Sequence, residues 1–167
     1  MDYYRIMEPT DLHSVLRPHL PSNTQIWSGK EPIFLPGSVQ GRGREEIFLP
    51  FYESRVMLIS SEIKSIWQSY QKGGRYRPCA FGSIGEGRIK PYSFMLPRVM
   101  EEVHPSTEYF PNGEIKKLVL DKERIGSQRV FGVCSLRHLR LIVAEDVLEE
   151  MLRKSITGFC WKRIEVQ

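Results

Sequence analysis

The residue types that most often carry chemistry are sparse in this sequence and poorly spaced for a site. The four histidines, His13, His19, His104 and His138, have no carboxylate or cysteine at the spacing that metal ligation requires. Cys134 and His138 are four residues apart, but in a strand and turn this interval does not bring both side chains to one side. Nothing nearby would orient the His138 imidazole as the base for a cysteine nucleophile. We therefore expect no metal, no cofactor and no catalytic residue.

Two glycine-rich stretches contain main-chain groups of the kind that hold phosphate. They are GSVQGRGR at residues 37–44 and GSIGEGR at residues 82–88. A phosphate-binding loop needs a strand before it and the N-terminus of a helix after it. Pro91 follows the second stretch too closely for such a helix, and the first fails on the same grounds. Both stretches predict hairpin loops, in which Arg42 and Arg44 could meet an acidic partner.

Several aromatic side chains lie in segments that lack a periodic apolar pattern. Trp27 lies in the polar stretch SNTQIWSGKEP, and Tyr109 and Phe110 lie in a proline-closed bend. Trp67 and Trp161 fall inside periodic segments, which favours core packing, and core packing also remains open for Trp27. Aromatic residues that stay exposed are common anchors of protein interfaces. The partner-binding candidates are Trp27, Arg42, Arg44, Glu86, Arg88, Tyr109 and Phe110.

The composition is that of an ordinary folded protein. The chain has 167 residues, of which 41% are hydrophobic and 26% charged, and this predicts a single domain over residues 1–167. Within it we expect an irregular N-terminal part at 1–50 and a core at 51–167. The net charge is +4, but acidic pairs such as Glu101–Glu102 interrupt the lysines and arginines. This predicts a mixed surface and not a nucleic-acid-binding stripe.

Cysteine usage and the apolar runs predict the compartment. Three cysteines, an odd number without short spacings, favour reduced and partly buried thiols in the cytosol over a disulfide framework. The N-terminal residues lack the apolar region of a signal peptide, and the sequence has no run of 18 apolar residues. We expect a cytoplasmic protein that does not insert into membranes.

Two segments of similar outline predict the scaffold. In residues 140–166, an apolar strand leads into an amphipathic helix with Val147 and Met151 on one face, and a second strand follows Gly158. Residues 55–82 repeat this order 84 positions earlier, which aligns Trp67 with Met151. The earlier helix has Ser60 or Ser61 as its N-cap. Two unrelated units of this length could also share this much pattern.

The remaining pattern consists mostly of strands and turns. Asp2–Met7 predicts an opening strand, and the tetrapeptide IFLP, at 33–36 and 47–50, predicts a hairpin of two short strands. A further strand at 92–100 is interrupted by Pro97, and Asn112–Gly113 predicts a turn. Together these elements predict an α+β fold in which a mainly antiparallel, curved sheet is packed by two short helices.

The C-terminal half resembles a known protein family. The resemblance is carried by the phrase at Leu118–Ile125, the strand at Val130–Val133, the strand and helix start at Leu141–Asp146, and Gly158 with Phe159. Val56–Trp67 repeats the strand-Ser-Glu-helix phrase. These motifs resemble those of the α+β immunity proteins of bacterial polymorphic toxin systems. The first 50 residues match only loosely, and Ala144 stands where that family usually has a serine cap.

The resemblance implies a cytosolic, non-enzymatic protein. Such proteins bind the toxin domain encoded beside them and cover its active site, and they supply no catalytic residues to carry over. Inhibition would use aromatic anchors surrounded by a charged rim. The basic charge suits a toxin with an acidic or neutral face. We therefore expect a cognate toxin domain as the partner, while the oligomeric state is not predicted.

Two other classes remain open. A small nucleic-acid-binding protein would need its cations on one face of the sheet. An enzyme would need a pocket with convergent polar groups and a residue of perturbed pKa, and the sequence predicts no such residue. The cations of the nucleic-acid alternative are Arg75, Arg77, Arg88, Lys90, Lys116, Lys117, Arg137 and Arg140.

Overall fold

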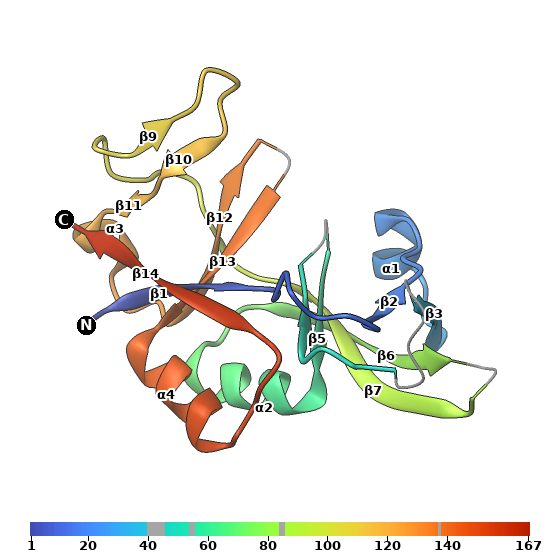
Figure 1. Cartoon of the computed structure of the whole chain (residues 1–167). Coiled ribbons are helices and arrows are strands. Elements are labelled where there is room, and N and C mark those ends of the chain that lie inside the picture. Colours follow the sequence, from blue (N-terminus) through green and yellow to red (C-terminus); the bar gives the residue numbers. More distant parts are fainter. Residues whose placement is uncertain (40–45, 54–55, 84–85, 137) are drawn as a thin grey trace.

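The computed structural model describes residues 1–39, 46–53, 56–83, 86–136 and 138–167. It is a mixed structure of helices and strands, in which strands predominate, helices are few, and the sheets are curved (Figure 1). The strands of the described residues form two six-stranded sheets and one two-stranded sheet. No helix in these ranges is both long and apolar enough to traverse a bilayer.

The first large sheet comes from the N-terminal half of the chain and has the strand order β2-β3-β6-β7-β5-β4. Its β3 and β6 are parallel, and its other neighbours are antiparallel. The longest strands, β6 and β7, form a hairpin that ends at the pair Ser83–Arg88. Their bounds are β2 Leu16–Pro18, β3 Ile33–Val39, β4 Phe51–Tyr52, β5 Met57–Ser60, β6 Arg75–Ser83 and β7 Arg88–Leu96.

The second large sheet has the order β11-β14-β1-β13-β12-β8. The strand nearest the N-terminus, β1, lies between β13 and β14 and is antiparallel to both. Pro97 ends β7, and the chain then crosses to β8 at the edge of this second sheet. The bounds are β1 Tyr3–Met7, β8 Val99–Met100, β11 Val119–Leu120, β12 Val130–Ser135, β13 His138–Ala144 and β14 Cys160–Val166.

The small sheet and the helices complete the described structure. The small sheet pairs β9, Glu108–Tyr109, with β10, Ile115–Lys117, around the predicted turn at Asn112–Gly113. The main chain closes this turn with a 2.8 Å bond from the Gly113 N–H to the Phe110 carbonyl. The helices are α1 Asn23–Ser28, α2 Ser61–Tyr70, α3 Lys122–Ile125 and α4 Glu145–Arg153.

The two large sheets share a common arrangement of five strands. The orders β3-β6-β7-β5-β4 and β11-β14-β1-β13-β12 have the same relative strand directions at every step. Both predicted strand-helix-strand units are present, as β5-α2-β6 and β13-α4-β14, and each surrounds a middle strand. In the first half that strand, β7, follows directly in sequence. In the second half the N-terminal β1 takes this place.

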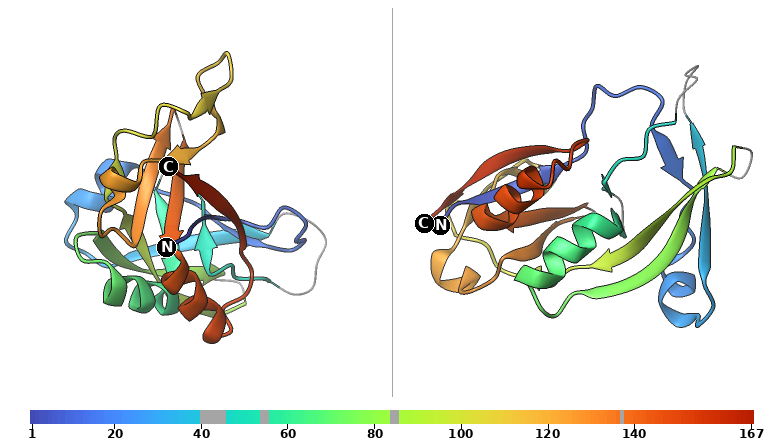
Figure 2. Two further views of the ribbon diagram at one scale, coloured as in Figure 1. Left: turned by 90° about the vertical axis from the view of Figure 1, so that its left-hand side faces the viewer. Right: turned by 90° about the horizontal axis from the view of Figure 1, so that it is seen from below.

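The equivalent helices pack against each other. Figure 1 and both views in Figure 2 show α2 and α4 side by side, and the indole N–H of Trp67 points at the sulfur of Met151 at 3.4 Å. These two residues are equivalent under the 84-residue repeat. Equivalent positions meet in this way across a two-fold axis. The helix pair is therefore the junction of two similarly built halves.

The middle of the first sheet, at residues 92–95 of β7, is covered by apolar side chains on both faces. On β7, Phe94 belongs to a core enclosed by the curled N-terminal sheet and α1. The neighbouring Met95 belongs to the larger core, which includes α2, α4 and the second sheet. Alternation along the strand produces this arrangement, because successive side chains point to opposite faces. Burial on both faces explains the nearly continuous apolar run of β7.

Several sequence-based expectations about the fold need correction. We expected one sheet and two helices, and the described residues form two large sheets, a small one and four helices. The opening strand predicted at Asp2–Met7 is present as β1, Tyr3–Met7. The rest of the N-terminal part at 1–50, expected to be irregular apart from the two IFLP strands, also contains β2 and α1. Both are short, and β2 is defined by its pairing with β3, which leaves little trace in the local pattern.

The predicted hairpin between the two IFLP copies is wrong. The first copy lies in β3, which pairs with β2 and β6. The second copy is held by side chains, since the Tyr52 hydroxyl accepts from the Leu49 N–H at 3.0 Å and the Tyr92 hydroxyl donates to the Leu49 carbonyl at 2.6 Å. Both main-chain groups of Leu49 are thus satisfied outside a strand ladder. Satisfied polar groups allow a buried segment to stay irregular.

Candidate protein-binding surfaces

The structure separates the partner-binding residues predicted from sequence into two distant groups. Trp27, Glu86 and Arg88 belong to the N-terminal half, near the first sheet. Tyr109 and Phe110 lie at or beside β9, at the opposite end of the molecule in Figure 1. Arg42 and Arg44 lie outside the described residues. No single surface therefore contains the whole predicted set.

Trp27 is not a freely exposed anchor. It lies on α1, whose N-terminus is fixed by a capping box between Ser22 and Gln25. The indole is half-buried against the N-terminal core, and the guanidinium of Arg75 stacks 4.8 Å from its ring centre. A cation over an indole face is a stabilising contact within the protein. This geometry agrees with the packing role that the sequence left open.

Tyr109 and Phe110 are exposed, and a third apolar residue lies near their turn. Their side chains are 53% and 49% exposed, and Leu136, in the turn between β12 and β13, is 67% exposed. A Cβ placed on Gly113 would lie 3.4 Å from Leu136 Cδ1, so the Leu136 side chain packs against the β9–β10 turn. We call Tyr109, Phe110 and Leu136 the tip surface. Sequence reasoning missed Leu136, although an apolar residue between two strands was a visible signal.

Polar contacts attach the tip surface firmly to the second sheet. The Ser135 hydroxyl accepts from the Ile115 N–H and donates to a Glu114 carboxylate oxygen, both at 2.9 Å. The Arg140 guanidinium donates to the Ile115 carbonyl at 2.6 Å. Burial lowers the pKa of Arg140. These bonds join β10 to the β12–β13 hairpin and orient the exposed side chains above it.

A second exposed apolar region lies on the outer face of β3, β6 and β7. It is a shallow hollow of about 670 Å³, which we call the trough. Its apolar lining includes Pro32, Pro78, Ala80, Ile89 and Pro91, and Ile89 is 54% exposed. The charged residues beside this lining are Lys30, Glu31, Arg77 and Lys90.

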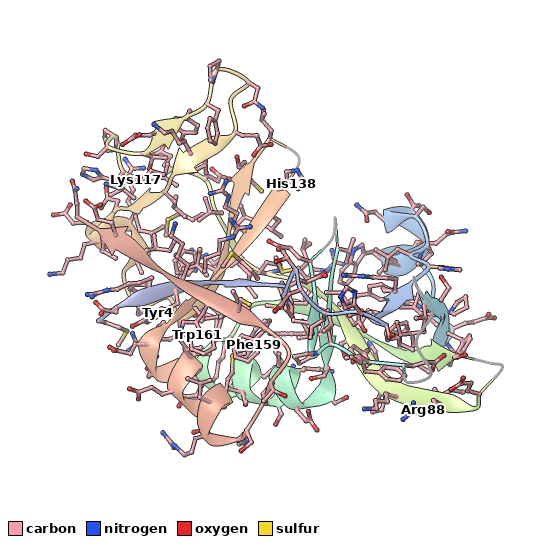
Figure 3. The ribbon with its side chains drawn as sticks, in the orientation of Figure 1. Tyr4, Arg88, Lys117, His138, Phe159 and Trp161 are labelled. Carbon is pink, nitrogen blue, oxygen red and sulfur yellow. The ribbon has the colours of Figure 1, made fainter. Side chains whose placement is uncertain are left out.

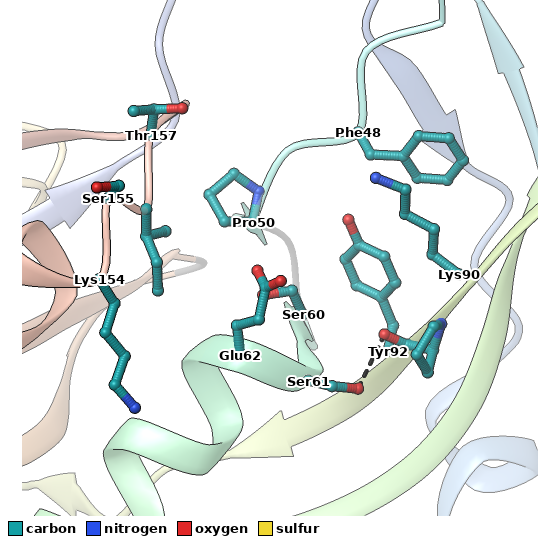
Figure 4. A pocket seen from close by; sticks show the side chains of 12 residues that line it. Phe48, Pro50, Ser60, Ser61, Glu62, Lys90, Tyr92, Lys154, Ser155 and Thr157 are labelled. Atoms are coloured by element: carbon teal, nitrogen blue, oxygen red, sulfur yellow. Dashed lines mark hydrogen bonds between the residues drawn. The ribbon is translucent and has the colours of Figure 1, made fainter.

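A third hollow, of about 320 Å³, lies between the two halves and is polar (Figure 4). Glu62 and Lys154 line it together with the first serines of α2. Both serine hydroxyls are occupied, since Ser60 accepts from the Ile63 N–H at 3.4 Å and Ser61 donates to the Pro91 carbonyl at 3.0 Å. Both serine side chains therefore form bonds to the main chain.

The cysteines and histidines do not assemble a reactive group in the described ranges. No cluster of three or more metal-ligating side chains occurs there. Ser135 is the register partner of His138, while Cys134 pairs with Leu139, so Cys134 and His138 face opposite sides of the hairpin. Burial raises the pKa of the Cys79 thiol to about 12. Cys134 and Cys160 are exposed, not partly buried as expected, because both lie on solvent-facing strand positions.

The cations of the nucleic-acid alternative are dispersed. Arg88 and Lys117 lie at opposite ends of the molecule in Figure 3. Lys117 forms an ion pair with Glu165 at 2.7 Å, and Lys116 forms one with Glu108 at 3.1 Å. Arg137 lies outside the described residues. No described face therefore gathers all of these cations.

No family model matches this chain, and no curated protein matches it significantly. The surfaces described above are therefore judged by their own chemistry. The tip surface and the trough both offer exposed apolar side chains beside charged ones, which is the usual composition of a protein interface. In the polar hollow, the hydroxyls of Ser60, Ser61 and Tyr92 are already bonded to the main chain.

Proposed function

We propose that this protein is an immunity protein, which binds a bacterial toxin domain in the cytosol and blocks it sterically. The observation that carries this proposal is the tip surface. Three large apolar side chains are held in solvent on a base of hydrogen bonds, where they add nothing to the core. Rigid apolar anchors of this kind supply most of the binding energy in protein interfaces.

The backbone at Leu136 supports a binding role. Its φ is +46°, in the left-handed region. This conformation costs a leucine residue about 1–2 kcal/mol of free energy, whereas glycine or asparagine adopts it readily. A leucine in this place is costly for folding and exposes its side chain beside the Gly113 turn. Costs of this kind are typical of functional surfaces.

The rim of the tip surface suits a partner of mixed charge. The ion pair Lys116–Glu108 is exposed on both sides and therefore contributes little to stability. Its groups remain available to a partner. The net charge of +4 favours a toxin with an acidic or neutral face.

The finer fold predicted from the order of elements in the sequence belongs to the same proposal. That fold is a mainly antiparallel curved sheet packed by two short helices. Eight of the eleven strand pairings in the described residues are antiparallel, and α2 and α4 pack together at the large core. The two additional helices and the three parallel pairings are departures from it.

Co-expression with the toxin domain encoded by the neighbouring gene tests the function. The wild-type protein should protect cells and bind the purified toxin domain. Tyr109→Ala and Phe110→Ala should each weaken binding by about tenfold or more, the effect of losing a hot-spot residue. Leu152→Ala is the matched control, since Leu152 is a 42% exposed apolar residue on α4, away from the tip surface. A wild-type protein that neither binds nor protects overturns the proposal.

A further inference from the structure

The duplication of the sheets provides an internal comparison for the trough. Ser60 of β5 pairs with Tyr92 of β7, and the equivalent Ala144 of β13 pairs with Tyr3 of β1. Tyr92 and Tyr3 are therefore equivalent positions, and so are the residues before them, Pro91 and Asp2. Cys79 also pairs with Tyr92, and Ile164 also pairs with Tyr3. Pro78 and Ala80 therefore correspond to Arg163 and Glu165. A hollow lined by Asp2 and residues 163–166 indeed lies at this place in the second half.

The same position is charged in one half and apolar in the other. In the second half, Arg163 pairs with Asp2 and Glu165 pairs with Lys117, both at 2.7 Å. The side-chain bond from Lys117 holds the pKa of Glu165 below its usual range. In the first half these places hold Pro78, Ala80 and Pro91, none of which carries charge. The fold therefore accepts charged residues here and does not require an apolar surface.

Two cations, Lys30 and Arg77, stand beside the apolar lining without a carboxylate partner among the described residues, against the single acid Glu31. Lys90 does not add to them, because its ammonium lies 4.8 Å from the centre of the Phe48 ring, on the side of β7 opposite to Ile89 and Pro91. Arg77 is oriented by bonds to the main-chain carbonyls of Gly29 and Glu31, the second at 2.7 Å. Such bonds fix the guanidinium and leave its charge uncompensated.

We propose that the trough binds an extended segment of a partner protein in which apolar side chains alternate with aspartate or glutamate. The apolar side chains would cover Ile89 and the prolines, and the carboxylates would meet Lys30 and Arg77. The hollow falls within the range of about 300–1,000 Å³ usual for binding sites. Its three prolines have restricted main chains, so less conformational entropy is lost on binding. The segment would bind whether or not the tip surface neutralises a toxin.

Fluorescence polarisation with short labelled peptides tests this surface on the full chain. The probe is a peptide in which leucine and glutamate alternate. Two matched peptides replace glutamate with lysine, or leucine with serine. The wild-type protein should bind the leucine-glutamate peptide at low salt, at least about tenfold more tightly than either control, and lose affinity as salt rises.

Variants taken from the protein's own second half provide the sharpest comparison. The double substitution Pro78→Arg and Ala80→Glu copies residues that the equivalent strand already accepts, so it should fold and lose peptide binding. Lys30→Glu should weaken binding of the acidic peptide and improve binding of the lysine peptide. Tyr109→Ala should leave peptide binding unchanged, which separates the trough from the tip surface. Equal binding of all three peptides, or no binding at low salt, overturns the proposal.

Discussion

At Leu136 the main chain takes a conformation that leucine adopts rarely, with φ at +46°. Because Leu136 is 67% exposed, burial of its side chain offsets little of this backbone strain. Its energetic benefit must come from a contact with another molecule if the tip surface functions as proposed. At the scale of single residues, function and stability therefore oppose each other here.

This opposition predicts the behaviour of Leu136→Gly. Removing the side chain relieves about 1–2 kcal/mol of backbone strain, while the flexible glycine costs about 0.5–1 kcal/mol through the unfolded chain. The melting temperature should therefore stay the same or rise, and binding of the toxin domain should weaken by about tenfold. Calorimetry and a binding titration measure the two effects. A large loss of stability would show that Leu136 is a structural residue and not an anchor.

The tip surface also shows what single residues reveal before a structure is known. Tyr109 and Phe110 were candidates for partner binding because their bend has no periodic pattern, and both are exposed in the structure. Ile89 and Pro78 gave no such signal, because each is ordinary in its own strand. Only the register between β6 and β7 places them in one trough. The sequence alone does not show that these residues lie close together in the folded protein.

At the scale of elements, two buried tyrosines determine the course of the segment before β4. Tyr52 and Tyr92 satisfy the N–H and the carbonyl of Leu49. Helix α2 was predictable because its signals are local, with Ser60 as N-cap and Ile63, Ile66 and Trp67 on the buried face. The Leu49 segment was not, since Tyr92 lies 43 residues away in sequence.

The tyrosine pair predicts a loss of stability in alkali. Burial raises the pKa of both hydroxyls above the ordinary value of 10.0. The unfolded chain therefore loses these protons first, and the stability they provide is complete below pH 10.0 and declines as pH rises above it. The pKa of Cys79 is raised from 9.0 to about 12, so this thiol adds a loss of stability that begins at a lower pH, near 9.0.

Urea unfolding between about pH 8 and pH 11 measures this decline. Tyr92→Phe should cost about 1–3 kcal/mol at neutral pH, because the buried Leu49 carbonyl loses its donor. The same variant should show a shallower alkaline decline than the wild-type protein. Identical slopes for the two proteins would contradict the assignment of the decline to Tyr92.

At the scale of the whole molecule, the duplication explains why β1 serves the second sheet. Tyr3 and Ile164 are register partners, so the first strand of the chain and its last one lie side by side. If the ends were joined and the chain were opened between β8 and β9, β1 would follow β14 as β7 follows β6. Both halves would then have the same strand order along the chain.

Such a circular permutant should fold to the same structure. The linker must span only the adjacent ends of β1 and β14, and the new ends fall in the segment at 101–107, which contains no helix or strand. Openings at such sites are usually tolerated. Circular dichroism and unfolding in urea should match the wild-type protein closely. Opening the chain within α2 is the control, since it interrupts the helix pair and should abolish cooperative unfolding.

The central position of β1 has a consequence for synthesis on the ribosome. The chain emerges from its N-terminus, so β1 leaves the ribosome long before β13 and β14, its partners at 138–144 and 160–166. The first sheet can complete its five repeated strands once β7 has emerged, because all of them lie before residue 97. Strand β1 therefore waits, with its main-chain groups unpaired, until β13 and β14 have been made.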